Sequence, residues 1–251
     1  TAGVGVRFGV PISENDSINF GLGFEQTKIG LFDDSPQRYK DFVNVFGPSN
    51  NTLRGDVSFA RDSRDSLLYP TKGRYQRAFL EAGLPGGDLK FYKTGYQHQI
   101  FLPVGGNFVL MLNGEVGIGN GYGGKPLPFF KNFYAGGPTS VRGYETGSLG
   151  PRDSNDESLG GNRRIVGNAE LLFPFPGLRN DKSVRMSVFT DFGAIYGTGE
   201  KLGSEGLRYS AGISVNWFSP IGPLKFSIAQ PLGSKPGDKK EVFQFQLGSS
   251  F

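Results

Sequence analysis

Apolar and polar residues alternate along most of this chain with a period of two. In the clearest run, residues 207–217, the odd positions are apolar or aromatic and the even positions are polar or glycine. Because successive side chains of a β-strand point to opposite faces, the pattern predicts about eleven strands of roughly 7 to 12 residues. They span residues 4–10, 18–25, 53–60, 78–84, 92–102, 108–118, 164–173, 184–196, 207–217, 224–228 and 243–251.

The connections between these strands alternate in length. Short turns are predicted at 11–17, 102–107, 174–182 and 219–223, and longer polar loops at 30–51, 119–161 and 197–206. Within the first of these loops, residues 36–46 predict a short surface helix. Short turns on one rim and long loops on the other are typical of outer-membrane β-barrels, whose tilted strands have this length.

The polar faces of the strands carry many charges: Glu115, Arg164, Glu170, Arg185, Asp191 and Arg208. In a soluble sandwich these charges would face water, and the apolar faces would pack sheet on sheet. In a transmembrane barrel the charges would face the lumen, and the apolar faces would meet lipid. Aromatic girdles mark membrane interfaces, so the aromatic residues near strand ends favour the barrel. They are Phe173, Tyr196, Trp217 and Phe251.

The stretch 119–161 is the longest segment without strand periodicity. Glycine and proline punctuate it, and loops of this length in compact domains are uncommon unless they are functional. It also carries an aromatic cluster that a solvated linker would avoid. The cluster consists of Phe129, Phe130, Phe133, Tyr134 and Tyr144. We therefore predict an all-β, antiparallel transmembrane barrel over residues 1–251, with the loop 119–161 folded into its lumen.

Composition excludes several classes of function. The chain has 40 Gly and 23 Phe, but no Cys and one His, and a net charge of +4 with scattered basic residues. No Ser-His-Asp set or zinc site is expected, because His98 has no second His or any Cys to join it. A nucleic-acid surface would need clustered charge, so none is expected. We expect no enzyme activity, no metal and no cofactor.

A family resemblance becomes visible in the loop. The segment from Lys125 to Tyr144, with Val141-Arg142-Gly143-Tyr144 at its end, resembles the sixth extracellular loop of the BamA family. These proteins are central subunits of bacterial β-barrel assembly machines. Further resemblance lies in the strand-turn-strand segment 61–73 and in the closing-strand segments 210–224 and 229–231. The terminal Phe251 resembles the C-terminal aromatic residue of outer-membrane proteins.

The resemblance implies an outer-membrane barrel of sixteen strands, preceded by periplasmic POTRA repeats. About eleven strands and no POTRA-like helices are predicted here, so we expect the C-terminal two-thirds of such a barrel, without the first five strands. No signal peptide stands at Thr1, so we expect a mature chain, a domain or a fragment. The family's weak seam lies between its first and last strands. The last-strand edge would consist of Phe243, Phe245, Leu247 and Phe251. Unpaired edges invite association, so we expect an open wall or an edge covered by another chain or by detergent.

Arg142 is the residue singled out within the loop. A guanidinium inside a barrel must be paired, because an uncompensated buried charge is costly. Parity places Glu170 and Asp191 on the lumen face of the next two strands, and the resemblance implies that the loop arginine docks against acids in these positions. The alternative is an arginine exposed at a turn. Gly143 is expected to permit a backbone conformation that a Cβ would forbid.

Two functions of this family remain open from the sequence. One is insertion and folding of other β-barrel proteins in the outer membrane of a Gram-negative bacterium. Its expected partners are membrane lipid, unfolded barrel substrates and, through the POTRA repeats, the lipoproteins of the assembly machine. The other is a secretion pore of the two-partner type, which shares the Arg-Gly-Tyr loop. The segment 129–137 favours the assembly factor.

Overall fold

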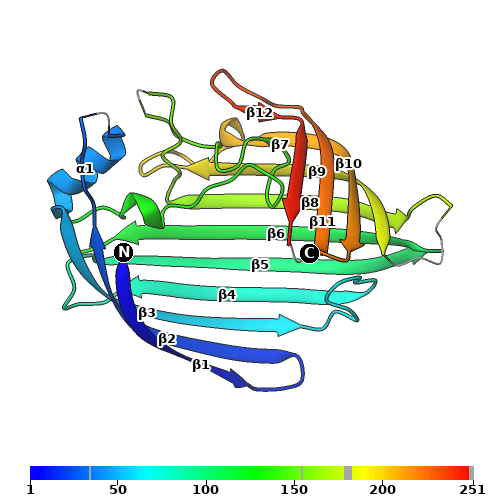
Figure 1. Ribbon diagram of the computed structural model, residues 1–251, viewed down its shortest axis with the longest axis horizontal. Coiled ribbons are helices and arrows are strands. Elements are labelled where there is room, and N and C mark those ends of the chain that lie inside the picture. The colour runs from blue at the N-terminus through cyan, green and yellow to red at the C-terminus, as the bar shows by residue number, and fades with distance from the viewer. Residues whose placement is uncertain (34, 154, 178–182, 249–251) are drawn as a thin grey trace.

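The computed structural model describes residues 1–33, 35–153, 155–177 and 183–248. Eleven strands form one antiparallel sheet in the order β1-β2-β3-β4-β5-β6-β8-β9-β10-β11-β13, and β7 pairs with β12 apart from it (Figure 1). The strands of the large sheet are β1 (Ala2–Pro11), β2 (Asp16–Lys28), β3 (Ser49–Asp62), β4 (Gly73–Gly83), β5 (Phe91–Gly105), β6 (Phe108–Gly121), β8 (Arg163–Pro174), β9 (Val184–Tyr196), β10 (Arg208–Ser219), β11 (Gly222–Pro231) and β13 (Phe243–Leu247). The remaining elements are α1 (Gln37–Phe46), η1 (Phe129–Lys131), β7 (Gly143–Tyr144), η2 (Ser204–Gly206) and β12 (Lys240–Glu241).

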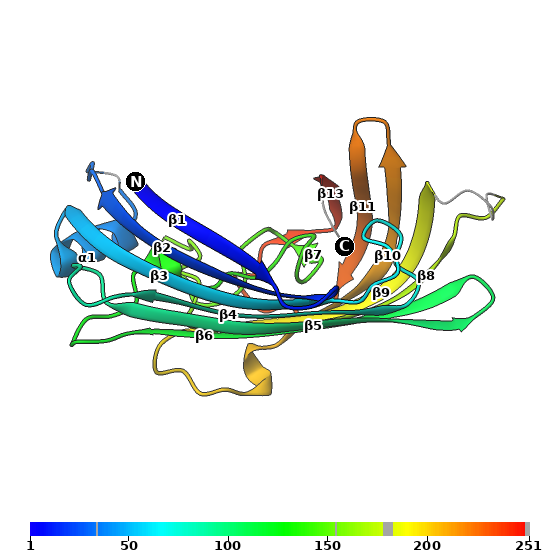
Figure 2. The same cartoon turned by 90° about the horizontal axis from the view of Figure 1, so that it is seen from below.

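The predicted eleven-strand antiparallel wall is confirmed. Consecutive strands of the sheet pair with each other throughout, so the sheet is a meander of hairpins. It does not close: β1 and β13 lie at its two ends, and neither has a second strand partner among the described residues. Figure 2 shows the sheet curving upward from its flat middle toward β10 and β11. The inside of this curve, called the concave face below, corresponds to the lumen of a closed barrel.

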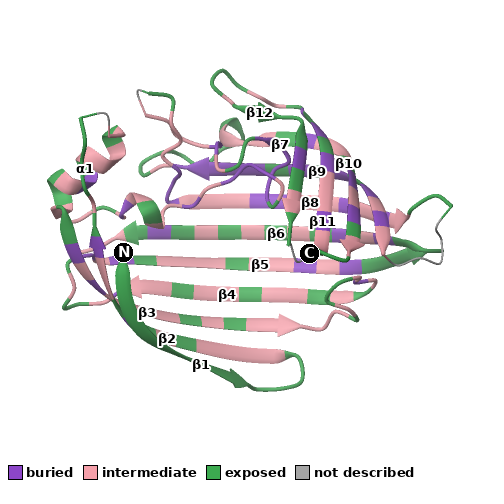
Figure 3. Ribbon diagram, in the orientation of Figure 1, coloured by how far each residue is buried: buried purple, intermediate pink, exposed green. Residues whose placement is uncertain are grey.

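The burial of the two faces decides between barrel and sandwich. On β10, Ile213 and Trp217 are 47% and 42% exposed, whereas Ser214 and Asn216 are each only 2% exposed. The apolar side of the strand therefore faces outward and the polar side is covered, which is the reverse of a soluble sandwich. Figure 3 shows the buried positions gathering on β8 to β11 and on the long loop. Among the described residues, the apolar side chains of the outer face do not pack against a second sheet in a dry core.

Two details depart from the sequence expectations. β3 begins at Ser49, inside the predicted loop 30–51, because its pairing with β2 continues as far as Lys28 opposite Ser49. Tyr196, expected in an outer aromatic girdle, is buried. Its hydroxyl donates to the Gly203 carbonyl, and the connection that contains η2 covers its ring. The predicted helix is present as α1, and no helix among the described residues is long and apolar enough to cross a membrane.

The connection between β6 and β8 folds back over the concave face. Its inner part forms a buried apolar cluster with β8 and β9, made of Phe133, Ala135, Val141, Tyr144, Leu149, Val166 and Ile195. Nearer its start, Phe129 packs on the helix α1, where the Phe42 and Phe129 rings lie 5.8 Å apart. Burial of so much apolar surface fixes the loop as a folded unit of the molecule, in contrast to a solvated linker.

Candidate functional site

The site begins with two carboxylates on neighbouring strands. Glu170 of β8 and Asp191 of β9 both point to the concave face, and they are only 1% and 0% exposed. The register pairs Asn168 with Asp191, so Glu170 lies one inward-facing position further along β8 from the residue opposite Asp191. Two buried carboxylates this close require positive charge and hydrogen-bond donors around them.

Arg142 supplies both. Its Nε and Nη2 donate to the two oxygens of Asp191 at 2.7 and 2.8 Å, and its Nη1 donates to Glu170 Oε2 at 3.0 Å. Its backbone N–H also donates to Asp191, at 3.0 Å. The guanidinium carbon lies 3.3 Å from the centre of the Phe189 ring. Arg142 therefore bridges two strands, through a bidentate contact to one carboxylate and a single contact to the other.

The guanidinium of Arg142 remains protonated in its buried site. Burial alone would lower the pKa of its guanidinium, but the adjacent Glu170 and Asp191 carboxylates outweigh burial and raise the pKa above its ordinary value. Arginine thus remains a cation throughout the range in which a protein is folded. The guanidinium therefore supplies a fixed positive charge to the contact.

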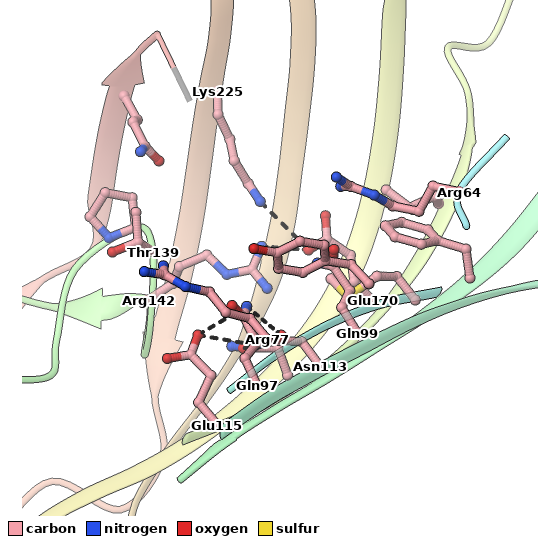
Figure 4. A pocket seen from close by; sticks show the side chains of 17 residues that line it. Arg64, Arg77, Gln97, Gln99, Asn113, Glu115, Thr139, Arg142, Glu170 and Lys225 are labelled. Carbon is pink, nitrogen blue, oxygen red and sulfur yellow. Dashed lines mark hydrogen bonds and ion pairs between the residues drawn. The ribbon is translucent and has the colours of Figure 1, made fainter. Parts of the chain in front are cut away.

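Further polar groups complete the coordination of the carboxylates. Ser187 and Ser214 donate to Glu170 Oε1 at 2.5 and 3.2 Å. Lys225 Nζ lies 3.6 Å from Glu170 Oε2, as Figure 4 shows. Asn168 donates to Asp191 at 2.9 Å and to the Ser140 carbonyl at 2.6 Å. Two cations therefore face two carboxylates. These four residues were not predicted to belong to the site, although their parity placed them on the same face.

The residues on either side of Arg142 hold the loop in place. Val141 is fully buried in the apolar cluster. Gly143 has φ +88°, a conformation that favours glycine, and a Cβ there would make a tight contact of 3.2 Å with the Ala229 Cβ. Tyr144 is also buried and donates from its hydroxyl to the Tyr209 carbonyl at 3.1 Å. Burial, together with the nearby Asp238 carboxylate, raises the pKa of Tyr144 to about 12, so the phenol remains a donor.

The other charges of the predicted polar face form separate contacts. Arg164 pairs with Glu115 at 2.9 Å, and Arg208 pairs with Asp238 at 2.5 Å. Arg185 donates to the carbonyl of Pro70 at 2.8 Å. None of these residues contacts Arg142, so the face carries several local ion pairs and the loop site is one of them.

The predicted closing-strand edge is exposed on its apolar side. Phe243, Phe245 and Leu247 of β13 are 59%, 52% and 57% exposed. β13 pairs with β11 over five residue pairs, from Leu224 opposite Leu247 to Ile228 opposite Phe243. Phe251, which was also assigned to this edge, lies outside the described residues.

A polar cavity of about 410 Å³ lies beside the Arg142 site (Figure 4). Its wall includes Arg77, Gln97 and Asn113 from the flat part of the sheet, Lys225 from the curved part, and Arg64 from the turn between β3 and β4. No group of three or more His, Asp or Glu side chains among the described residues is arranged to hold a metal ion. The charged and hydrogen-bonding groups of this site can hold the loop in place.

An antiparallel sheet with an apolar outer face, a polar concave face and an inserted loop defines the outer-membrane β-barrel class of protein. Comparison with known families supports a narrower assignment. The family model of the Omp85 superfamily domain matches residues 1–251, so this chain belongs to the Omp85 superfamily.

Known relatives extend this assignment. The chain is 42% identical to the outer membrane protein assembly factor BamA of Neisseria meningitidis serogroup B, over all of this chain and 36% of that protein. It is 31% identical to the mouse sorting and assembly machinery component 50 homolog, over 81% of this chain and 47% of that protein. The chain thus spans about a third of the length of the bacterial relative.

A solved structure has the same fold. The crystal structure of BamA from Haemophilus ducreyi lacking POTRA domains 1–3 superposes with a TM-score of 0.88 at 29% identity. The match covers 99% of this chain and 54% of that one. The eleven strands described here therefore correspond to part of the barrel of an outer-membrane assembly protein.

Proposed function

We propose that this chain is the C-terminal part of the barrel of an assembly factor that inserts and folds β-barrel proteins in the outer membrane of a Gram-negative bacterium. The observation that carries the proposal is the closing strand β13, which rests on the docked loop and has an outer edge without a strand partner among the described residues. The names of the bacterial relative, an outer membrane protein assembly factor, and of the mouse relative, a sorting and assembly machinery component homolog, support it.

The proposed mechanism is non-covalent. An unpaired edge presents a row of backbone N–H and C=O groups, and an incoming strand can pair with it by β-augmentation. The exposed Phe243 and Phe245 side chains beside this edge would contact lipid. In this account, the substrates are unfolded outer-membrane β-barrel proteins, and the lipoproteins of the assembly machine bind mainly to the repeats that precede the barrel in this family.

We assign Arg142 the role of fixing the loop. Docked as described above, the loop fills part of the concave face and positions the segment that leads into β13. Arg142 therefore links the wall of the barrel to its closing strand, through its contacts with Glu170 on β8 and Asp191 on β9. No nucleophile or general base enters this account.

Reconstitution tests the proposal. Full-length protein in lipid vesicles should accelerate the folding of an unrelated outer-membrane barrel, measured by the heat-resistant mobility of the folded form on gels. Vesicles without the protein, and vesicles with an unrelated porin, are the controls. No acceleration of any barrel substrate, together with passage of an unfolded polypeptide into the vesicles, would replace the proposal with a secretion pore of the same superfamily.

A further inference from the structure

A short segment before the closing strand runs along the loop motif. β12 pairs with β7 in antiparallel register, with Lys240 opposite Tyr144 and Glu241 opposite Gly143. The backbone N–H of Glu145 adds a hydrogen bond to the carbonyl of Lys239 at 2.9 Å. Figure 1 shows these two strands at one end of the concave face, where β12 leads directly into β13. The same motif that carries Arg142 is thus paired with the chain that enters the last strand.

Gln244, on the inner side of β13, strengthens this contact. Its Oε1 accepts a hydrogen bond from the Gly143 N–H at 3.2 Å, and its Nε2 donates to the Tyr144 carbonyl at 2.8 Å. Nε2 also donates to Glu241 Oε2 at 3.1 Å. Gln244 is 3% exposed, while its neighbours Phe243 and Phe245 point to the outside. One side chain therefore binds the loop as a peptide group of a neighbouring strand would, with one donor and one acceptor.

The closing strand has little else to hold it. Five register pairs join β13 to β11, whereas ten join β10 to β11. The opposite edge of β13 has no strand partner among the described residues. Each net hydrogen bond contributes about 1 kcal/mol, so two buried bonds from Gln244 are a large addition to so short a ladder.

We propose that Gln244 is a positioning residue, which couples docking of the Arg142 loop to the position of the closing strand β13. While Arg142 is bound to Glu170 and Asp191, the backbone of Gly143 and Tyr144 lies within hydrogen-bond reach of Gln244. These hydrogen bonds then hold β13 against the docked loop. When the loop leaves its site, β13 is held by the β11 ladder alone. The proposal deepens the assembly function proposed above and rests on it for its biological meaning, but the coupling itself does not depend on any substrate.

Hydrogen exchange measured by mass spectrometry tests the coupling in the full-length protein in lipid nanodiscs, without substrate. In Gln244→Leu, amide exchange of residues 239–247 should rise about tenfold or more relative to wild type. The matched control is Gln246→Leu, because Gln246 has the same parity on the same strand and lies at the wall of the cavity. Exchange in β8 and β9 should be unchanged in both variants.

A double-mutant cycle separates coupling from simple loss of local structure. Arg142→Ala should raise exchange of residues 239–247 in the wild-type background and add clearly less in Gln244→Leu, because the side-chain link between the loop and β13 is already removed and only the backbone pairing of β12 with β7 remains. Gln244→Glu keeps the acceptor for Gly143 but loses the donor and faces Glu241, so it should also raise exchange, and it serves as the test if the Leu variant does not fold. Wild-type exchange in Gln244→Leu or Gln244→Glu, or equal effects of Arg142→Ala in both backgrounds, would overturn the proposal. If the vesicle reconstitution fails but hydrogen exchange shows the expected coupling, only the proposed assembly function is overturned.

Discussion

Arg142 places a full charge where little water reaches, and three side-chain hydrogen bonds to two carboxylates compensate for it. The two sides of this contact depend on each other. Without the guanidinium, Glu170 retains Ser187, Ser214 and Lys225, whereas Asp191 retains Asn168 as its side-chain donor. The backbone N–H of residue 142 also still donates to Asp191. The loss therefore falls mainly on Asp191, because a buried carboxylate with two neutral donors and no cation beside it is poorly solvated.

Arg142→Ala should loosen the loop while the wall strands stay paired. Removal of one partner of a buried ion pair costs about 3–5 kcal/mol, and the apolar cluster around Val141 retains only part of the docking energy. Proteolysis within residues 136–150 should become faster, while heat-resistant gel mobility persists. The cleavage rate of Arg142→Lys should lie between those of wild type and Arg142→Ala, because an ammonium group cannot form the bidentate contact with Asp191. An unchanged cleavage rate in Arg142→Ala would show that the ion pairs do not hold the loop.

Gly143→Ala tests the backbone next to this contact. An alanine at φ +88°, with its Cβ 3.2 Å from Ala229, should destabilise the docked loop by about 1–3 kcal/mol. Urea-induced unfolding, followed by tryptophan fluorescence, measures the change. The control is Gly114→Ala, since Gly114 has an ordinary φ and a Cβ there would meet no atom within 4 Å. Equal midpoints for the two variants would contradict the strain argument.

At the scale of elements, β9 is the strand to which several inserted segments attach. Its inward-facing residues contact, in order along the strand, the turn 63–72 through Arg185, Glu170 through Ser187, and the loop through Asp191. Arg185 is 2% exposed, and its guanidinium carbon lies 4.3 Å from the centre of the Tyr69 ring. One strand thus anchors a short turn at one end of the barrel and the long loop further along.

Arg185→Ala should release the turn 63–72 from the concave face. The variant loses the hydrogen bond to the Pro70 carbonyl and the contact with the Tyr69 ring, so hydrogen exchange across the turn should increase severalfold. Arg61→Ala is a suitable control, because Arg61 lies near the same turn but is more exposed and forms a longer ion pair, 3.6 Å to Asp16. The same exchange in both variants would mean that the turn is held by its own internal hydrogen bonds.

The elements themselves could be predicted from sequence, but their alignment could not. Period-two alternation located all eleven strands of the large sheet and put Glu170 and Asp191 on one face, because parity is a local property of a strand. The contacts of Ser187, Ser214 and Lys225 with Glu170 depend on the register between strands, which no local pattern records. Gln244 binds residues about a hundred positions earlier in the chain. Tyr196 was misplaced because a following connection covers an otherwise outward position.

At the scale of the whole molecule, the sheet is an open wall with two unpaired ends. β1 is exposed along its entire length on both faces, and β13 exposes its apolar side. Unpaired strands of this kind are templates for pairing with another chain. The open wall also explains why polar residues on the flat part of the concave face are less buried than those around the loop.

The 251-residue chain purified alone in detergent should therefore associate. We expect dimers or larger species by size-exclusion chromatography with light scattering, since each free edge offers unpaired backbone donors and acceptors. Proline substitutions at Gly5 and at Phe245 should reduce the association, because in the registers of β1 with β2 and of β13 with β11 each removes a backbone donor that faces the free edge. A stable, fully protected monomer of this chain would show that its edges pair with each other.

The central claim is that docking of the Arg142 loop underlies the assembly function. It is tested most directly by expressing full-length variants in cells depleted of their own copy of the protein and measuring rescue. Arg142→Ala should fail to restore growth and normal amounts of outer-membrane barrel proteins, although it reaches the membrane in folded form. Arg7→Ala should restore both, because Arg7 is exposed and forms a 3.3 Å ion pair with Asp56 far from the loop. Full rescue by Arg142→Ala, at an equal amount of folded protein, would contradict the claim that loop docking underlies the function.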